Sequence, residues 1–290
     1  MIFRRRSTPD AEFTQLDRAA ADRFRSVVTA ELARRGRPCR IEAGVAHTGE
    51  RAYGLENLVR LVAPRPQEEW PALVAQHLDV VDAASEREPA PVDLAALLPR
   101  LRRVEDADGS TLQRRLTDDL VSLLVLDEPD RVTTPTAQTL LATGVAADAL
   151  GRRALANLAD HLRAEPLDRF EVQTDGRPVH GLVGDSFFVA SAALLPAAQG
   201  WLGPDPYGQG HLVAVPSRHV LMATPVGGPP DWVVTTNTLV QLATGRHDAD
   251  PGPISPDVYW VRADRWTRIS QRAASGVSVT PGPELEALLR

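Results

Sequence analysis

The spacing of apolar residues predicts several helices near the start of the chain. In residues 10–35 an apolar side chain returns every three or four positions, which is the spacing of an amphipathic helix. Gly36 ends this pattern. Residues 55–62 and 70–81 repeat the spacing, with prolines between them. Residues 40–46 alternate loosely between apolar and polar side chains and predict a strand.

Strand and helix patterns alternate through the rest of the chain. The continuous apolar run at residues 121–126 is short and partly β-branched, as expected for a buried strand. An Asp175-Gly176 pair between two apolar stretches indicates a β-hairpin. The helices predicted here span residues 134–143, 147–162, 185–195, 229–244 and 284–289, and the strands span residues 169–173, 179–183, 211–215, 258–262 and 266–269.

This mixture of patterns predicts an α/β (mixed α+β) fold. We expect a mixed sheet with antiparallel hairpins covered by helices, plus an N-terminal amphipathic helix. With 290 residues, of which 43% are hydrophobic and 24% charged, the chain is long and apolar enough to bury a sizeable core. The predicted parts are a basic amphipathic helix at 1–36, an N-terminal α/β part at 37–104, a C-terminal α/β part at 111–270, and a loosely ordered tail at 271–290.

The net charge of −6 is unevenly distributed along the chain. Residues 1–40 contain ten arginines and five acidic residues, a local charge of +5, which leaves −11 for the remainder. The acidic remainder would repel nucleic acid and anionic membranes, and stripes of basic residues with interleaved aromatics are absent. Arg18 and Arg25 are instead candidates for a surface that binds a protein partner. Tyr259 and Trp260 on the last predicted hairpin are further candidates, because an exposed aromatic pair would mark an interaction surface, although most such aromatics are core residues.

The amino-acid composition excludes several kinds of chemistry. The chain contains no lysine, so it cannot supply a Schiff-base amine or the lysine of a phosphate-binding P-loop. The single Cys39 excludes an internal disulfide and any zinc site that needs two thiolates. The seven histidines lack the spacing that places two imidazoles on one helical face, so we expect no metal and no cofactor.

The hydropathy of the chain predicts a cytoplasmic protein. No stretch approaches the roughly 20 apolar residues of a membrane-spanning helix. The first ten residues are basic and then polar, without the apolar region of a secretory signal. The single cysteine is compatible with a reducing compartment.

Asp127 and Glu128 follow the predicted buried strand at 121–126. Nucleotide hydrolases place a magnesium ligand and a base at such a position, but that chemistry also needs a Gly-rich loop with a lysine. We therefore expect a strand that opens into a polar turn at Pro129. A hydrolytic role for this carboxylate pair remains an alternative.

The segment Gly184-Asp185-Ser186 follows a predicted strand and opens a predicted helix. A nucleophile elbow has this setting, but it needs a glycine two residues after the serine, where Phe188 stands. Asp185 or Ser186 could simply cap the helix. Because helix N-termini attract anions, the segment is also a candidate site for a phosphate or carboxylate group.

Ser217 and Arg218 form a second candidate segment. The predicted strand at 211–215 stops at Pro216 and would deliver both residues into solvent. The forked guanidinium of Arg218 could bind a carboxylate or phosphate, although pairing with a neighbouring acidic residue is the alternative. The predicted ligand-binding set therefore consists of Gly184, Asp185, Ser186, Ser217 and Arg218.

The order of several segments resembles the YtpQ-like family of bacterial proteins, which is classed as a domain of unknown function. The segments are LLVLDEPDRV, ALANLADHL, GDSFFVASAALL, HLVAVPSRHVLM and ISPDVYWV, with GLENLVRLV nearer the start. The resemblance covers residues 40–270, and arginine replaces lysine throughout. It implies a cytoplasmic α/β protein and carries no established reaction, cofactor or catalytic residue.

The leading functional hypothesis is a non-catalytic module that binds a protein partner or a small anionic ligand. The first alternative is a hydrolase that uses Asp185 and Ser186 with His211 or His219. Separations beyond about 6 Å between these side chains would exclude general acid–base roles. The second alternative is a structural subunit of a larger assembly.

Overall fold

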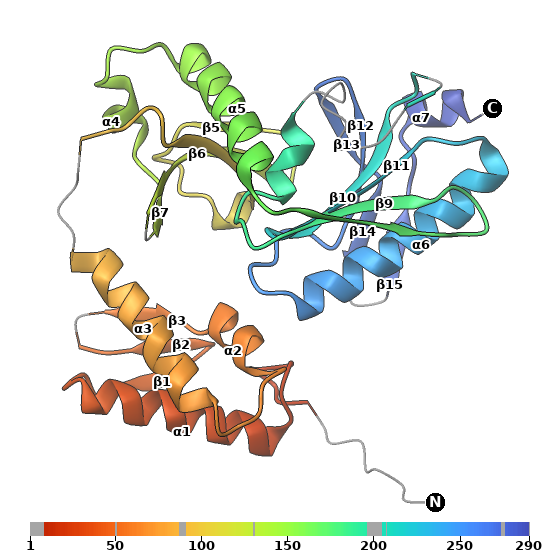
Figure 1. Cartoon of the computed structure of the whole chain (residues 1–290). Coiled ribbons are helices and arrows are strands. Elements are labelled where there is room, and N and C mark those ends of the chain that lie inside the picture. Colours follow the sequence, from red (N-terminus) through yellow and green to blue (C-terminus); the bar gives the residue numbers. More distant parts are fainter. Residues whose placement is uncertain are drawn as a thin grey trace, which may run out of the picture. The chain divides into compact units, whose positions relative to one another are not determined.

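The chain divides into two compact units, Met1–Pro89 and Ala90–Arg290 (Figure 1). The computed structural model describes residues 9–49, 51–86, 91–129, 131–195, 205–206, 208–273 and 276–289. The first eight residues of the predicted basic helix segment, and residues 274–275 and 290 of the predicted tail, lie outside this set. The fold is mixed α+β, as predicted. The predicted boundary at 105–110 lies inside the second unit, where the 3₁₀ helix η1 (Val104–Asp106) directly follows a strand.

The first unit combines helices with a small antiparallel sheet. The first helix begins at Arg18, later than predicted, because the Asp17 side chain caps it by accepting a hydrogen bond from the Ala20 amide at 2.9 Å. The predicted strand at 40–46 is a hairpin, since Ala43 and Gly44 adopt positive φ angles of 49° and 73° and reverse the chain. The elements are α1 (Arg18–Arg34), β1 (Arg40–Glu42), β2 (Val45–His47), β3 (Ala52–Gly54), α2 (Glu56–Val62) and α3 (Trp70–Glu86).

The first helix belongs to the core of this unit and is not a separate segment. Helix α1 packs against α3, and the ring of Phe24 makes edge-to-face contacts with Phe13 and Trp70 at 5.1 and 6.3 Å. Arg25, a predicted partner-binding residue, instead forms ion pairs within the unit, including one to Asp10 at 2.7 Å. Arg18 lies exposed at the first position of α1.

The carboxylate of Asp82 joins α3 to the rest of the first unit. It receives hydrogen bonds from Arg37 at 2.6 Å, Tyr53 at 2.9 Å, Arg35 at 3.1 Å and Arg51 at 3.3 Å. Burial raises the pKa of Asp82, but the hydrogen bonds from Tyr53 and the arginines outweigh this effect and lower it overall. The ionised carboxylate therefore holds together cations that would otherwise repel one another.

Replacing Asp82 with alanine should selectively destabilise the first unit. Loss of the shared acceptor leaves partly buried guanidinium groups uncompensated, so we expect a cost of about 2–3 kcal/mol. Asp79→Ala is the matched control, because Asp79 pairs with Arg35 from an exposed position and should contribute less than about 0.5 kcal/mol. Hydrogen exchange of peptides from α1 and α3 in increasing urea measures both effects. Equal protection in the two variants would contradict this role of Asp82.

The second unit begins with a small antiparallel sheet covered by helix α5. The strand order is β4-β6-β5, with β7 also paired to β6, and α5 packs on β4 (Figure 1). The sequence pattern missed β4 because Pro99 and Arg100 interrupt its apolar residues and two more arginines end it. β4 is an edge strand, where proline is tolerated. The elements are β4 (Leu97–Arg103), β5 (Gln113–Arg115), β6 (Leu120–Glu128), β7 (Arg131–Thr133), α4 (Ala137–Leu141) and α5 (Ala147–Ala164).

A six-stranded antiparallel sheet forms the centre of the second unit. Its side chains alternate between two cores: Val213 and Val215 face the core shared with β6 and α5, whereas Leu212 and Ala214 face the core covered by α6 (Pro229–Ala249). In the order β13-β12-β10-β11-β9-β8, the strands are β13 (Arg265–Arg268), β12 (Val258–Arg262), β10 (His211–Ser217), β11 (Val220–Pro225), β9 (Val179–Val183) and β8 (Asp168–Val172).

Two predictions in the second unit need correction. The predicted helix at 185–195 is only a short 3₁₀ helix, η2 (Ala190–Leu194), because residues 185–189 form turns. The predicted loosely ordered tail contains a hairpin of β14 (Ser270–Ala273) and β15 (Gly276–Val279), followed by α7 (Pro283–Leu288). Leu285 of α7 is fully buried in the core that α6 covers, so burial of apolar surface fixes this segment.

Tyr259 and Trp260 are core residues, so the prediction that they form an exposed partner surface is wrong. They are 0% and 4% exposed because β12 is covered on both faces. The Tyr259 hydroxyl donates to Asp119 at 2.7 Å and shares a hydrogen bond of 2.6 Å with Ser255. The indole of Trp260 donates to the Gln209 carbonyl at 2.8 Å. Both polar groups thus have partners inside the protein.

The Tyr259 hydroxyl should contribute to the stability of the second unit. Burial, and then the Asp119 charge, raise the pKa of Tyr259 well above its usual value, so the hydroxyl stays protonated and donates to Asp119. Tyr259→Phe leaves that carboxylate without its donor and should lower the free energy of unfolding by about 1–3 kcal/mol. Urea unfolding followed by hydrogen exchange of β12 peptides measures the change. An unchanged free energy of unfolding would show that the Tyr259–Asp119 hydrogen bond does not stabilise the second unit.

Candidate functional site

Two segments that the sequence singled out lie side by side in the structure. Strand β9 pairs with β11, and the Gly184 amide that follows β9 donates to the His219 carbonyl at 3.3 Å. In return, the His219 ring contacts the Gly184 carbonyl through Nδ1 at 3.2 Å. The Ala190 amide donates to the Arg218 carbonyl at 3.2 Å. The predicted ligand-binding residues Gly184, Asp185, Ser186 and Arg218 are therefore gathered around the β10–β11 turn.

The side chain of Arg218 has close neighbours at its guanidinium and along its stem. Its guanidinium carbon lies 3.9 Å from the centroid of the Phe187 ring, a cation–π contact. The stem passes close to Gly252, where a Cβ atom would lie 2.6 Å from Arg218 Cδ, and the positive φ of 67° also favours glycine. Arg218 Nε donates to His219 Nε2 at 2.9 Å. These contacts restrict where the guanidinium can point.

Ser217 is fully buried, so the prediction that it enters solvent is wrong. Strand β10 continues through Pro216 to Ser217 by an irregularity in its pairing with β11. The Ser217 hydroxyl lies 3.5 Å from Asp250 Oδ2. Of the predicted ligand-binding residues, Asp185 is exposed, and Gly184, Ser186 and Arg218 are half-buried.

Two further arginines join Arg218, both from the edge strand β4. Arg100 and Arg102 flank Leu101, whose amide donates to the Ser191 hydroxyl at 3.2 Å, next to the residue that hydrogen-bonds Arg218. Because side chains alternate along a strand, Arg100 and Arg102 lie on one face of β4. These three arginines, Arg100, Arg102 and Arg218, are called the arginine cluster below.

The charges of the arginine cluster are not balanced by carboxylates. In the part of the chain that the structure describes, no acidic side chain forms an ion pair with any of the three arginines. Burial, followed by repulsion among the cluster's own charges, lowers the pKa of both Arg100 and Arg218 to about 10. Arg100 Nε is buried without a hydrogen-bond partner among the described residues. The cluster is therefore positively charged at neutral pH and electrostatically strained.

Beside this cluster, the Ser186 hydroxyl contacts a histidine that sequence reasoning did not select. His161 Nε2, from helix α5, lies 2.9 Å from Ser186 Oγ. Asp127 at the end of β6 approaches His161 Nδ1 at 3.6 Å, and Glu165 approaches Nε2 at 3.7 Å. These carboxylate distances exceed hydrogen-bonding range but allow electrostatic stabilisation of a protonated imidazole. A serine, a histidine and two carboxylates thus meet.

The two histidines predicted to serve Ser186 are engaged elsewhere. His219 uses Nε2 to accept from Arg218 and Nδ1 to contact the Gly184 carbonyl, which makes it a neutral imidazole with its proton on Nδ1. His211 is only 2% exposed in strand β10. The serine–histidine pairing proposed from the sequence is therefore replaced by one with His161.

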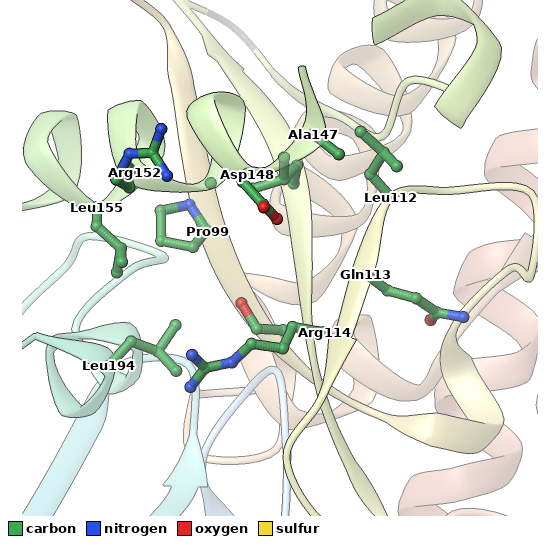
Figure 2. A pocket seen from close by; sticks show the side chains of 12 residues that line it. Pro99, Leu112, Gln113, Arg114, Ala147, Asp148, Arg152, Leu155 and Leu194 are labelled. Carbon is green, nitrogen blue, oxygen red and sulfur yellow. The ribbon is translucent and has the colours of Figure 1, made fainter. Parts of the chain in front are cut away.

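A cavity of about 460 Å³ lies between α5 and the sheet β4-β6-β5. Figure 2 shows the apolar side chains of Pro99, Leu155 and Leu194 among those that line it, together with the charged side chains of Arg114, Asp148 and Arg152. Both arginines are exposed to solvent. Water and salt screen their charges, so they would attract an anionic ligand only weakly. We therefore place the candidate site at the arginine cluster, where charged groups are partly buried.

The sequence analysis did not select several residues near the site, although some of them stand in a recognisable pattern. Arg100 and Arg102 alternate with Leu101, and two arginines on one face of an apolar segment are an unusual pattern for a buried strand. His161 lies in the last turn of the predicted helix at 147–162, and Glu165 follows four residues later, so a helix continued by one turn would place both on one face. The packing of the Arg218 stem against Gly252 could not be predicted from the sequence, because Arg218 lies 34 residues away along the chain.

Comparisons with known proteins do not identify a relative. No family model, no curated protein and no solved structure matches this chain. The resemblance to the YtpQ-like family therefore stays a prediction. Within the described ranges, no group of three or more His, Cys, Asp or Glu side chains could hold a metal ion. The helices of those ranges also lack the combined length and apolarity that crossing a membrane requires.

Removing the charge of Arg218 should change the titration of His219. Burial, and then the Arg218 charge, lower the pKa of His219 below its usual 6.5. Because the neutral ring accepts the Arg218 hydrogen bond, that bond is present at neutral pH and is lost as the pH falls through the lowered pKa. Arg218→Gln should shift the His219 pKa upward toward 6.5, measured by NMR of the ring protons. The same midpoint in Arg218→Gln and Arg103→Gln, the control, would contradict this coupling.

Proposed function

We propose that this protein binds a small anionic ligand through a phosphate or carboxylate group at the arginine cluster. The observation that supports the proposal most strongly is that three neighbouring guanidinium groups are partly buried without an acidic partner in the described chain. Burying unpaired charge is costly, so such a grouping is expected where an anion supplies the missing charge. Guanidinium forks match the oxygens of phosphate and carboxylate groups.

Local packing around the cluster favours a preorganised site. Phe187 and Gly252 restrict the Arg218 stem, and the β4 pairing with β6 fixes the backbone of Arg100 and Arg102. A restricted side chain loses less conformational entropy when a ligand binds. The buried and unpartnered Arg100 Nε is a further donor that an anion could satisfy.

Other arginines of the chain provide a contrast that supports this choice. Arg25 and Arg35 in the first unit contact carboxylates, which raise the pKa of both groups. Carboxylates of the fold therefore already compensate the charges of Arg25 and Arg35. The cluster arginines differ in that their neighbours are other cations, so they keep capacity for an external anion.

The functional hypotheses that concern protein partners stay predictions. Arg18 is exposed, but Arg25, Tyr259 and Trp260 have internal partners, which leaves little of the predicted partner surface. The structural-subunit alternative stays a prediction as well. A cytoplasmic location, where small phosphorylated and carboxylated metabolites are abundant, is part of the proposal.

Titration with inorganic phosphate tests the proposal directly. Phosphate at constant ionic strength should raise the melting temperature of the full chain more than chloride does, because it binds the folded state. Arg218→Ala and Arg100→Ala should each weaken phosphate binding by about 10–100-fold, as expected for loss of a charge-assisted hydrogen bond of about 1.5–3 kcal/mol. Isothermal titration calorimetry measures the dissociation constants.

Arg103→Ala is the matched control for this titration. Arg103 lies on the same strand as Arg100 and Arg102, but it pairs with Glu105 at 3.1 Å, and its side chain is 36% exposed. Its removal changes the net charge equally and should leave phosphate binding unaltered. Equal weakening by Arg103→Ala would indicate nonspecific electrostatic attraction, and the absence of any phosphate effect on the wild-type chain would refute the proposal.

A further inference from the structure

The Ser186 hydroxyl makes two contacts, of which only one is expected for a serine in a turn. Its Oγ accepts the Phe188 amide at 3.2 Å, which is the local bond expected of a turn serine. The same oxygen lies 2.9 Å from His161 Nε2, on a helix 25 residues away in sequence. Because the amide already donates to Oγ, the hydroxyl proton can point at His161, provided that Nε2 is the unprotonated nitrogen.

Carboxylates and an aromatic ring surround the His161 imidazole. Asp127 Oδ2 lies 3.6 Å from Nδ1, and Glu165 Oε1 lies 3.7 Å from Nε2, so carboxylates flank both ring nitrogens. The Phe188 ring packs edge-on to the imidazole at 5.3 Å and fixes its plane. Burial raises the pKa of Asp127, while His161 opposes the shift, as expected for a partly desolvated pair.

A small molecule can reach these groups. A cavity of about 270 Å³ is lined by Asp127, His161, Glu165 and the segment from Asp185 to Phe188. A neighbouring cavity of about 370 Å³ shares Asp127 and His161 and includes Leu98, which lies on the same face of β4 as Arg100. The side chains of His161 and Asp127 are 21% and 32% exposed. The serine and histidine are thus accessible rather than sealed.

From this geometry we infer that Ser186 is a nucleophile activated by His161 as general base, and that the site hydrolyses small carboxylic esters. Asp127 positions and electrostatically stabilises the imidazolium that forms. The glycine that a nucleophile elbow needs is replaced by Phe188, but a serine–histidine pair is defined by its geometry and not by one sequence motif. The inference rests on the Ser186–His161 contact and does not depend on anion binding at the arginine cluster.

The reaction proceeds in two steps, acylation of Ser186 and hydrolysis of the acyl-serine. Ser186 Oγ bonds to the ester carbonyl carbon while its proton passes to His161 Nε2; the bond to the alcohol oxygen then breaks, and His161 returns the proton to the departing alcohol. Water, the second reactant, attacks the acyl-serine and gives a proton to His161. The bond to Ser186 breaks, the proton returns to Oγ, and the carboxylic acid leaves.

Covalent labelling of the full chain with a fluorophosphonate provides the test. Ser186 Oγ should displace fluoride from phosphorus, and peptide mass spectrometry should find the phosphonyl group on Ser186. Turnover of p-nitrophenyl acetate should accompany labelling. His161→Gln should slow labelling by about 100-fold or more, the usual contribution of a general base. Asp127→Asn should slow it less, since Asp127 acts through a 3.6 Å contact.

The controls separate chemistry from folding. Ser278→Ala removes an exposed hydroxyl that donates to the Gln271 carbonyl and should react like the wild-type chain. Ser186→Ala abolishes labelling but also removes the bond from Phe188, so His161→Gln, which leaves that turn intact, is the decisive variant. Circular dichroism verifies that each variant folds. A pH dependence of labelling that disappears in His161→Gln excludes a merely structural role.

The possible outcomes distinguish this inference from the proposed function. If Ser186 is not labelled, or is labelled equally fast in His161→Gln, the nucleophile assignment is overturned, whatever the phosphate titration gives. If labelling proceeds as expected while phosphate fails to bind, the arginine cluster proposal falls and the nucleophile stands. Phosphate titration of Ser186→Ala completes the comparison, because the variant retains all three arginines of the cluster.

Discussion

Burial of the central hairpin β10–β11 on both faces is the constraint on which the second unit depends. Odd-numbered positions such as Val213 and Leu221 enter one core, and even-numbered positions such as Leu212 and Met222 enter the other. A strand covered on both faces offers little room for unpaired polar side chains. The turn at Arg218 is therefore where this hairpin can present polar groups, and the bond from Ala190 fixes its position.

The arginines of the two units differ in how their charges are compensated. In the first unit Arg35, Arg37 and Arg51 all form ion pairs with the carboxylate of Asp82. In the second unit burial, and then the charges of neighbouring arginines, lower the pKa values of Arg100 and Arg218, and Arg100 Nε has no hydrogen-bond partner among the described residues. A fold tolerates such strain when burial elsewhere supplies the stability, as the two cores around the six-stranded sheet do.

Periodicity predicted elements where a single face is buried and failed where packing decides. The helices α1 and α5 have clear apolar faces, so their existence could be predicted, and only their ends depended on caps such as Asp17. Strand β4 was missed because Pro99 and Arg100 interrupt its apolar residues. Strand β11 was missed because it is buried on both faces and therefore lacks the period-two alternation of a half-exposed strand. The helical pattern at 185–195 was misleading, since the same apolar residues fill a core from turns and a 3₁₀ helix.

The sequence alone determined the mixed α+β class, most of the helices, and the choice of Ser186 and Arg218 as polar residues within apolar segments. Those properties follow from local spacing. The tertiary structure alone decided that Tyr259 and Trp260 are buried, and that Ser186 meets His161 and not another histidine. The physical reason is that burial and side-chain partners depend on which strands pair and which helices cover them, and these are contacts between residues distant in sequence.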